Sequence, residues 1–571
     1  MRECIWHPRP VPRPEVEEPP PGYADLPASL ALLLARRGLE AEALAGFLDP
    51  TACPGSSWRE LGSADRAAAR IALAVERGER ILVHGDFDAD GMTATALVCR
   101  LLDHLGADSC YFIPDRIESG YGLGEEGVRA AVDGGCGMLL TVDCGTSALQ
   151  ASDALAGAGV DLVVCDHHES SGDLPVSVAV VNPVLDGAGS PFSVLAGVGV
   201  AFKLAEALVE ITGCDSSILD RLMELVAIGT ICDVVPLTGE NRTLVARGLQ
   251  MLRTRPGTGL QSLARIAGID LGSIGGSDIA FGLGPRLNAC GRVGDADWGV
   301  ELLLTDDESR ASELSSLIDR NNQLRKDLDR LVHSEASRLA ADQADRKTLV
   351  LCSDRWHQGV LGIAASRLAR EYGRPAVLIS LESEPAKGSA RSIEGFEVHS
   401  ALSAVSDLLE TFGGHPQAAG LSIRRDNIPA FSERFELYAA EAIGDEPLHP
   451  ILYYDGALAG PDYTLDTVRQ LGRLEPFGEG NREPVWIACA AKVLDVGTMG
   501  SGRHLRARFS VDGRRVDAVG FGMGDRAGDL RGLVDIAFVL SENRYGGNPS
   551  LQLILRDFRD PGAVEASRER A

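Results

Sequence analysis

The sequence lacks the cysteine pairs that mark zinc knuckles and disulfide frameworks. Its 571 residues include 12 cysteines, which are scattered singly, and no two of them form a C-x-x-C pair. Zinc-binding modules and disulfide-rich secreted domains usually show regular cysteine spacings. We therefore expect free thiols and a protein of the reducing cytoplasm.

Long apolar runs are missing as well. No stretch approaches the roughly 18 residues that a transmembrane helix needs, and the most apolar one, residues 194–202, is followed by Lys203. The proline-rich first residues contain no apolar core of the kind found in signal peptides. The sequence predicts a soluble protein that does not enter a membrane.

There is also no excess of basic residues. Lys and Arg number 55 against 82 Asp and Glu, which gives a formal net charge of −27. A protein that coats nucleic acid through unspecific charge would show the opposite balance. The charge argues against that class, but it leaves room for an enzyme that meets nucleic acid through a local patch or through metal ions.

What the sequence does contain is a series of polar residues at the ends of apolar segments. Three such segments read as buried strands, at residues 81–83, 138–142 and 161–165, and an acid interrupts a fourth at 229–236. The polar residues concerned are His84, Asp86, Asp88, Asp90, Asp143, Asp166, His167, His168 and Asp233. Because parallel strands end at one edge of a sheet, we expect these side chains to meet in one crevice.

A mixed set of carboxylates and imidazoles indicates divalent cations. Clustered carboxylates are costly to bury unless a cation neutralises them. The set suits two Mn²⁺ ions about 3.5–4 Å apart, with Mg²⁺ as a substitute, an arrangement that activates water and clamps a phosphoryl group. The expected metal ligands are His84, Asp86, Asp88, Asp90, Asp143, His167 and Asp233. Asp143 would bridge the ions, Asp166 would orient an imidazole, and His168 would contact the phosphate or protonate the leaving oxygen.

Each motif also has a plainer interpretation. A D-x-D pair after a strand can be a solvated turn or a helix cap, adjacent histidines can be surface residues, and Asp233 can cap a helix. The occurrence of all the motifs together favours the metal site.

The order of the predicted elements divides the chain into regions. Strands and helices alternate to about residue 236, which is typical of a parallel α/β sheet. Apolar residues at helical spacing between Trp298 and Asp345 predict one long amphipathic helix, and a smaller second α/β unit follows it. Short strands with glycine turns then fit an OB-type β-barrel. The expected regions are a proline-rich arm with a small helical segment at 1–60, the catalytic α/β domain at 61–240, a helical connection at 241–345, the second α/β domain at 346–446, the barrel at 447–560 and a tail at 561–571.

Several residues are candidates for binding phosphate. A glycine-rich segment lets backbone N–H groups approach an anion, and hydroxyl and guanidinium groups add hydrogen bonds. The candidates are Arg116, Arg286, Arg292, His357, Ser389, Arg391, Gly413, Gly414 and His415. The alternative is that the glycines form a tight turn and the arginines pair with acids. Within the expected barrel, residues 473–515 carry eight Lys or Arg against five Asp or Glu, as a module that binds single strands would.

These motifs resemble those of the DHH phosphoesterase superfamily. His-x-x-x-Asp-x-Asp at 84–90, Thr-Val-Asp-Cys-Gly at 141–145, Asp-His-His at 166–168 and Asp233 are similar to its four motifs. Phe-Gly-Gly-His-Pro at 412–416 resembles the glycine-rich motif of the associated DHHA1 domain. The segments 284–292 and 474–481 resemble those of RecJ-type single-stranded-DNA exonucleases, and the likeness extends from about residue 60 to 560.

The resemblance implies a metal-dependent enzyme that degrades single-stranded DNA from its 5′ end to mononucleotides in DNA repair and recombination. The metal ligands it implies are Asp88, Asp90, Asp143, His167 and Asp233, with His84 and Asp86 as further members of the first motif. Its expected partners are single-stranded DNA, a helicase and a single-strand-binding protein, and one chain is expected to act as a monomer. Cys144 and Thr146 depart from the asparagine and isoleucine of many relatives, at positions that should not touch the metal.

Two other functions remain open at this stage. One is a DHH phosphodiesterase or phosphatase that acts on short oligonucleotides or dinucleotides, and the other is an inactive replication scaffold. The complete set of acids and histidines argues against a scaffold. The additional barrel favours a long single-stranded substrate over a short one.

Overall fold

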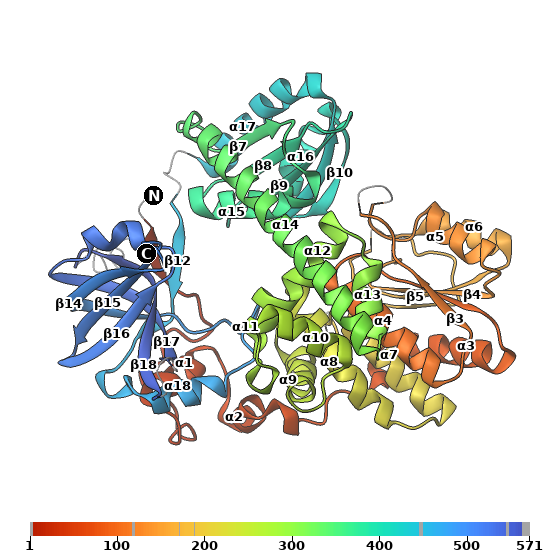
Figure 1. Ribbon diagram of the computed structural model, residues 1–571, viewed down its shortest axis with the longest axis horizontal. Coiled ribbons are helices and arrows are strands. Elements are labelled where there is room, and N and C mark those ends of the chain that lie inside the picture. Colours follow the sequence, from red (N-terminus) through yellow and green to blue (C-terminus); the bar gives the residue numbers. More distant parts are fainter. Residues whose placement is uncertain are drawn as a thin grey trace. The chain divides into compact units, whose positions relative to one another are not determined.

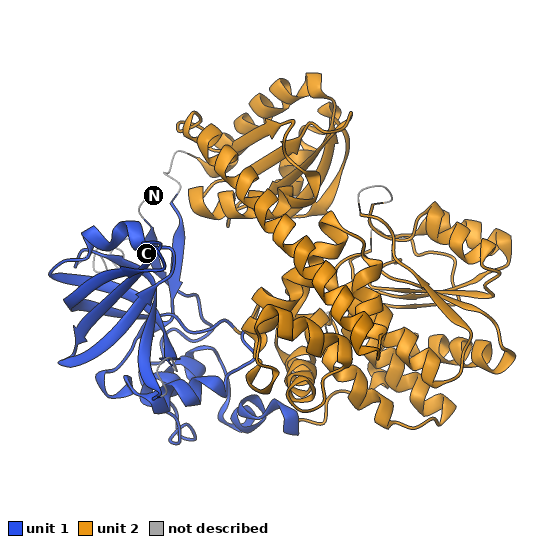
Figure 2. Ribbon diagram, in the orientation of Figure 1, with its two compact units in different colours: residues 1–52, 449–477, 482–571 blue, residues 53–448, 478–481 orange. Residues whose placement is uncertain are grey.

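A computed structural model of the chain describes residues 4–116, 120–170, 172–187, 189–444, 449–543 and 548–561. They form two compact units (Figure 2). The larger unit comprises residues 53–448 and 478–481, and the smaller one comprises 1–52, 449–477 and 482–571. Among the described helices, none combines the length and the apolar character that crossing a membrane requires.

The larger unit begins with a five-stranded parallel sheet in the order β3-β2-β4-β5-β6. Its strands are β2 (Ile81–His84), β3 (Ser109–Phe112), β4 (Met138–Val142), β5 (Asp161–Cys165) and β6 (Ala179–Val181). Successive residues point to opposite faces, so Val83 and Leu140 join one core while Leu82 and Leu139 join another. Both faces are therefore covered, as is usual for parallel sheets.

Helices cover both faces of this sheet (Figure 1). On one face lie α5 (Glu125–Asp133) and α6 (Leu149–Ala158), which contribute Ala131 and Leu155 to the core around Leu82. The other face is covered by α3 (Ala64–Arg77), α4 (Ala89–His104) and α7 (Gly197–Thr212). The predicted parallel α/β domain is confirmed.

A group of helices follows this sheet. They are α8 (Ser217–Cys232), α9 (Gly239–Thr254), α10 (Thr258–Ala267), α11 (Gly276–Asp278), a π-helical turn (Ile279–Leu283), α12 (Gly284–Val293), α13 (Asp297–Leu304) and α14 (Glu308–Ala341). The predicted long helix is α14, but it begins later than expected, because Trp298 belongs to α13. Asp307 starts α14 by accepting a 2.7 Å hydrogen bond from the N–H of Arg310. The C-terminal part of α14 packs on the second sheet through Val332 and Ala336.

The second sheet is mixed, in the order β10-β11-β9-β8-β7. Parallel β7 (Leu349–Ser353) and β8 (Ala376–Ser380) adjoin antiparallel β9 (Ala386–Arg391), β11 (Ala418–Ile423) and β10 (Leu409–His415). One face packs against α15 (Leu361–Tyr372) and the other against α16 (Val398–Ser403) and α17 (Ile428–Ile443). Gly413 and Gly414, for which a tight turn was one interpretation, lie instead in the edge strand β10, opposite Gly420 and Ala419.

The smaller unit is built around a closed β-barrel. Its strands are β13 (Gly456–Ala457), β14 (Trp486–Met499), β15 (His504–Val511), β16 (Arg514–Gly520), β17 (Leu533–Asn543) and β18 (Ser550–Arg559). Strand β14 pairs with both β15 and β17, which closes the barrel and confirms the predicted OB-type architecture. The helix α18 (Leu465–Gly472) packs beside the barrel through Leu471.

The N-terminal residues also belong to this smaller unit. Strand β1 (Ile5–Pro8) pairs in parallel with β12 (Ile451–Tyr454), and α1 (Ala28–Arg36) contributes Leu30 and Leu34 to the barrel core, followed by α2 (Ala41–Leu48). The predicted extended arm therefore contains a strand. Helices α1 and α2 lie in the expected small helical segment, and they pack with the C-terminal barrel rather than standing apart.

Candidate active site

The loop after β2 brings two acids to the carboxyl edge of the parallel sheet. Asp88 caps α4, because its Oδ1 accepts hydrogen bonds from the N–H groups of Asp90 and Gly91 at 2.9 and 3.0 Å. The helix-cap interpretation therefore holds for Asp88. Asp86 is buried, and its Oδ1 has no hydrogen-bond partner among the described residues.

Asp90, in the first turn of α4, binds the start of another helix. Its Oδ2 accepts a 2.7 Å hydrogen bond from the N–H of Gly197, and its Oδ1 a 3.0 Å bond from that of Val198. Both N–H groups belong to the first turn of α7, whose partial positive charge favours a carboxylate. Asp90 thus fixes α7 against α4 beside the site.

Asp143 and His167 meet where β4 and β5 end. Asp143 has a φ of 61°, a left-handed conformation that is uncommon for residues other than glycine. Its Oδ1 lies 3.1 Å from Nε2 of His167, which in turn lies 3.7 Å from Oδ2 of Asp233 at the end of α8. All three atoms are buried without a hydrogen-bond partner in the described part of the chain.

Asp166 holds the other histidine. Its carboxylate accepts hydrogen bonds from the backbone N–H groups of Thr146, His167 and His168, and a 2.8 Å bond from Nδ1 of His168. Although burial opposes both charges, this pairing lowers the pKa of Asp166 and raises that of His168. The imidazole that Asp166 orients is therefore His168, the candidate for phosphate contact, and not the candidate ligand His167.

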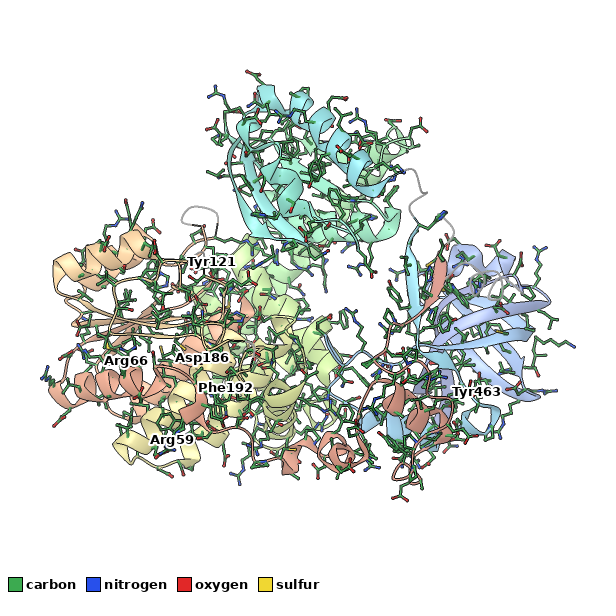
Figure 3. All side chains as sticks on the ribbon, turned by 180° about the vertical axis from the view of Figure 1, so that it is seen from behind. Arg59, Arg66, Tyr121, Asp186, Phe192 and Tyr463 are labelled. Atoms are coloured by element: carbon green, nitrogen blue, oxygen red, sulfur yellow. The ribbon has the colours of Figure 1, made fainter. Side chains whose placement is uncertain are left out.

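Tyr121 and Asn182, which no sequence motif singles out, complete this arrangement. The Tyr121 hydroxyl lies 2.8 Å from Nδ1 of His168 and donates to the backbone oxygen of Asp143 at 3.2 Å; Figure 3 labels Tyr121. The Asn182 amide donates to Thr146 Oγ1 at 2.9 Å and to the His168 oxygen at 2.8 Å. Both residues lie outside the helices and strands, where no periodic pattern could single them out.

The ligand atoms of these residues form three overlapping groups. They are Asp86, Asp88 and Asp143; Asp90, His167 and Asp233; and Asp143, His167 and His168. Within each group the ligand atoms lie within 4.8 Å of one another. Asp143 and His167 each belong to two groups, so the three groups form one continuous cluster. The unpartnered oxygens and the neutral imidazole fit hard divalent cations such as Mn²⁺ and Mg²⁺.

Burial controls the protonation of the metal-free site. Burial, which is the larger cause, and the negative charge of Asp88 raise the pKa of Asp86. The same two causes raise the pKa of Asp233 to about 7. Burial is also the first cause of the raised pKa values of Asp90 and Asp143. Burial lowers the pKa of His167 to about 4, which leaves its imidazole neutral and able to bind a cation. A bound cation would favour the ionised carboxylates.

His84 does not join these groups. It is fully buried, and its Nδ1 lies 3.6 Å from the Cys144 sulfur. Its Nε2 lies beside α5, where a Cβ placed on Gly127 would come within 2.7 Å. The position of His84 therefore gives no support to the predicted ligand role.

A cavity of about 570 Å³ lies next to the metal-binding groups, and Tyr121 lines it. Its described lining contains no carboxylate but four cations, which are Arg116, Arg292, Lys387 and Arg391. Burial and, to a smaller extent, the positive charge of Arg116 lower the pKa of Arg391. The same two causes lower the pKa of Arg292 to about 9. Like charges held together out of water favour the binding of an anion.

The structure separates the predicted phosphate-binding residues into two sets. Those that line this cavity are Arg116, Arg292, Ser389, Arg391 and Gly413. His357 lines a neighbouring cavity of about 480 Å³, which also includes Arg116 and Arg292. Gly414 and His415 line neither cavity. Arg286 is engaged elsewhere, because its Nε lies 2.9 Å from Asp319 Oδ1, so the ion-pair alternative holds there.

Models of known families match three parts of the chain. The DHH family N-terminal domain matches residues 80–230, the DHHA1 domain matches 345–441, and the RecJ OB domain matches 454–557. The "Single-stranded-DNA-specific exonuclease RecJ" of Escherichia coli is 34% identical over 570 residues, which cover 95% of this chain and 98% of that protein.

Solved structures agree with these matches. The crystal structure of RecJ from Thermus thermophilus in complex with Mn²⁺ has a TM-score of 0.83 and 33% identity, and the match covers 98% of this chain and 80% of that one. The same protein in complex with Mg²⁺ has a TM-score of 0.77 and 32% identity, and the match covers 98% and 79%. With relatives matched over nearly the whole chain, this protein belongs to the RecJ family of single-stranded-DNA-specific exonucleases.

Proposed function

We propose that the protein is a metal-dependent exonuclease that hydrolyses single-stranded DNA from the 5′ end and releases mononucleotides, in DNA repair and recombination. The observation that carries this proposal is the link between two sites. The cavity with four cations binds an anion, and Tyr121 in its wall contacts His168 beside the candidate metal ligands. A terminal phosphate bound in the cavity would place the first phosphodiester beside these ligands. The activity named for the relatives agrees with this arrangement.

The candidate ligands fit two Mn²⁺ ions, with Mg²⁺ as a substitute. Asp86, Asp88 and Asp143 would hold one ion, and Asp90, His167 and Asp233 the other. When bound, such ions supply Lewis-acid activation of water and of the phosphodiester. The crystal structures of the Thermus relative with Mn²⁺ and with Mg²⁺ support this choice.

The protein's own groups bind the substrate and handle protons. Arg116, Arg292 and Arg391 neutralise phosphate charge in a cavity whose described lining contains no carboxylate. Asp166 holds Nδ1 of His168 at 2.8 Å, which fixes the ring and leaves Nε2 to hydrogen-bond a phosphate oxygen or to protonate the leaving oxygen. Asp143 stays in place because its backbone oxygen accepts the Tyr121 hydroxyl.

The barrel is the proposed second contact with the strand. Phe521 has 59% of its surface exposed, and its ring lies 5.5 Å from that of His504. The same barrel carries the exposed Arg503, in the turn before β15, and the exposed Arg515 in β16. Aromatic rings among basic groups stack nucleobases without sequence preference. The basic excess counted from the sequence is partly neutralised, since Arg508 lies 2.7 Å from Asp517.

Binding of a fluorescent 20-nucleotide single strand tests the barrel. Stacking of one base on an aromatic ring contributes about 1–3 kcal/mol, so Phe521→Ala should weaken binding about 5- to 150-fold. Leu533→Ala serves as the control, because Leu533 is 51% exposed on the same barrel and carries no aromatic ring. Equal affinities of the two variants would remove the barrel from the proposal.

Exonuclease assays test the activity itself. We expect Mn²⁺ to support progressive shortening, from the 5′ end, of a 5′-phosphorylated single strand labelled at its 3′ end. Asp143→Asn should abolish the reaction, because Asp143 belongs to two of the three ligand groups. Duplex DNA, RNA and cyclic dinucleotides serve as comparison substrates. Cleavage of dinucleotides alone would point to a short-substrate phosphodiesterase, and inactivity towards all of them would point to a scaffold.

The expected partners form the last part of the proposal. We expect the enzyme to act as a monomer and to receive single strands from a helicase in the presence of a single-strand-binding protein, in the cytoplasm. Light scattering during size-exclusion chromatography tests the monomer, with an expected mass of 60.4 kDa. A stable dimer would contradict this part alone.

A further inference from the structure

A second cavity adjoins the one with four cations. It measures about 510 Å³, and both cavities are lined by Arg292 and Arg391. None of the described residues around the second cavity belongs to the segment that carries Arg116 and Tyr121. Tyr121 is the wall residue that contacts His168 beside the candidate metal ligands. The second cavity therefore extends from the first one on the side away from Tyr121.

One face of α15 supplies the other basic groups of this second cavity. Ile363, Arg367 and Arg370 all line it, and their spacing of four and three residues places them on the same face of the helix. Both arginines are exposed. The neighbouring acid Glu371 binds to α14, where its Oε2 lies 2.7 Å from Nε2 of His333. The described lining thus offers four guanidinium groups, those of residues 292, 367, 370 and 391, and no carboxylate.

Arg391 connects the two cavities. A Cβ on Gly362 would lie 2.5 Å from Nη2 of Arg391, so the glycine allows this guanidinium to lie against the first turn of α15. Towards described groups, Arg391 donates through Nη1, to Ser389 Oγ and to the Ala390 oxygen at 2.8 Å each. Its Nε and Nη2 are left to bind an anion. Because the same guanidinium lines both cavities, anions bound in the two cavities are close neighbours.

We propose that the second cavity binds the outer phosphoryl groups of a single strand that carries a 5′-diphosphate or 5′-triphosphate. Successive phosphates along a strand are separated by a whole sugar, whereas those of a 5′-triphosphate are joined by single oxygen atoms. The closeness of the two cavities matches the second spacing. The inference rests on the proposed exonuclease function, which places the phosphate nearest the sugar in the first cavity and the first phosphodiester beside the metal ligands.

The reaction on such a strand would give a different first product. Water adds to the phosphorus of the first phosphodiester, the bond from this phosphorus to the 3′ oxygen breaks, and the 3′ oxygen leaves with a proton. The shortened strand keeps this phosphorus as its new 5′-monophosphate. No bond between phosphoryl groups breaks, so a 5′-triphosphorylated strand yields one nucleoside triphosphate, and mononucleotides follow.

Binding without divalent metal tests the cavity separately from catalysis. A 20-nucleotide single strand, labelled at its 3′ end, is prepared with a 5′-hydroxyl, a 5′-monophosphate or a 5′-triphosphate. We expect the triphosphate strand to bind about tenfold more tightly than the monophosphate strand, since two exposed ion pairs are added. The double variant Arg367→Ala/Arg370→Ala should remove this difference and bind the monophosphate strand as the wild type does. Inorganic tripolyphosphate should displace the triphosphate strand from the wild type.

Arg346→Ala/Arg434→Ala is the matched control. It removes the same charge from the same domain, at arginines that pair with Glu433 and Asp407 and that line neither cavity. This variant should keep the tenfold preference. Equal weakening of all three strands by Arg367→Ala/Arg370→Ala would show that the cavity follows the strand's backbone, and would overturn the proposal. So would equal affinities of the wild type for the monophosphate and triphosphate strands.

Product analysis with Mn²⁺ completes the test. Chromatography of a digest of the 5′-triphosphorylated strand should show one nucleoside triphosphate per strand. Release of phosphate or pyrophosphate before the first nucleotide would contradict the proposal. If every strand stays intact while the preference in binding persists, the proposed exonuclease function is wrong and the assignment of the cavity still holds.

Discussion

The Nε2 atom of His167 lies 3.1 Å from Oδ1 of Asp143, and neither atom has a hydrogen-bond partner among the residues that the structure describes. A neutral imidazole nitrogen and a carboxylate oxygen each offer a lone pair, so the two atoms can bind the same cation. The same geometry makes the metal-free protein sensitive to pH.

The stabilisation by Mn²⁺ should grow as the pH rises. Folding raises the pKa of Asp233 from 3.8 to about 7, so the folded metal-free protein keeps a proton that the unfolded chain releases. The stability linked to this proton is fully present below the unfolded pKa and is lost as the pH rises through about 7. A cation that replaces the proton removes this loss. We expect Mn²⁺ to raise the melting temperature more at about pH 8 than at about pH 5.

Differential scanning fluorimetry with and without Mn²⁺ measures this effect. Asp143→Asn provides the control, because it removes a residue shared by two ligand groups, and its melting temperature should respond little to Mn²⁺ at either pH. An equal response of the wild type at both pH values would contradict the prediction.

Gly197→Ala should disable the metal centre without unfolding the domain. A Cβ at Gly197 would lie 2.4 Å from Oδ1 of Asp143, so that side chain would have to move. The N–H of Gly197 also donates a hydrogen bond to Asp90, so the substitution would displace two candidate ligands, Asp143 and Asp90. We expect at least a tenfold weaker Mn²⁺ response in fluorimetric titrations and a loss of nuclease activity.

Gly199→Ala is the matched control on the same helix. The nearest atom to its added Cβ is Cδ2 of Leu195, at 3.2 Å, at the end of a side chain that can adjust. This variant should keep its Mn²⁺ response. If both variants lose it, the effect belongs to α7 and not to the contact with Asp143.

Arg391→Ala should reduce the preference for a 5′-phosphate. A hydrogen bond to a charged group contributes about 1.5–3 kcal/mol, so KM for a 5′-phosphorylated strand should rise about 10- to 150-fold. KM for the 5′-hydroxyl strand should change little. Arg286→Ala is the control, because Arg286 is paired with Asp319 and is not part of the cavity lining. A larger rise in KM for Arg286→Ala would contradict the assignment.

Trp6→Ala should destabilise the smaller unit. Trp6 is fully buried, its Nε1 donates to Asp557 at 2.8 Å, and the guanidinium of Arg559 lies 4.2 Å from its ring centre. Removing a buried aromatic side chain costs about 3–5 kcal/mol. His7→Ala, at the next and less buried position, should cost far less. Limited proteolysis that compares cleavage of the barrel in the two variants measures the difference.

The parts of the site that follow strands could be predicted from the sequence. The apolar runs of β2, β4 and β5 mark their own ends, and the topology of a parallel sheet brings those ends together. Asp143, His167 and Asp233 therefore meet as expected.

The remaining parts depend on contacts that local pattern does not encode. His84 occupies the expected position in its motif. Its ring nevertheless packs against α5, where Gly127 has no side chain that would collide with it. Arg286 lies in a motif with Arg292, but only the packing of α12 against α14 shows that Asp319 neutralises it. No periodicity near Tyr121 indicates that its hydroxyl lies between Asp143 and His168.

The pairing of β1 with β12 bears on the order in which the chain can fold during synthesis. Residues Ile5–Pro8 leave the ribosome before the larger unit does, whereas their partner strand, Ile451–Tyr454, follows only after the larger unit has been made. Domains generally fold as units while translation proceeds. The larger unit can therefore mature early, while the first 50 or so residues wait for the barrel. A ribosome stalled near residue 445 should carry a folded nuclease core with an N-terminal segment that proteases still cut.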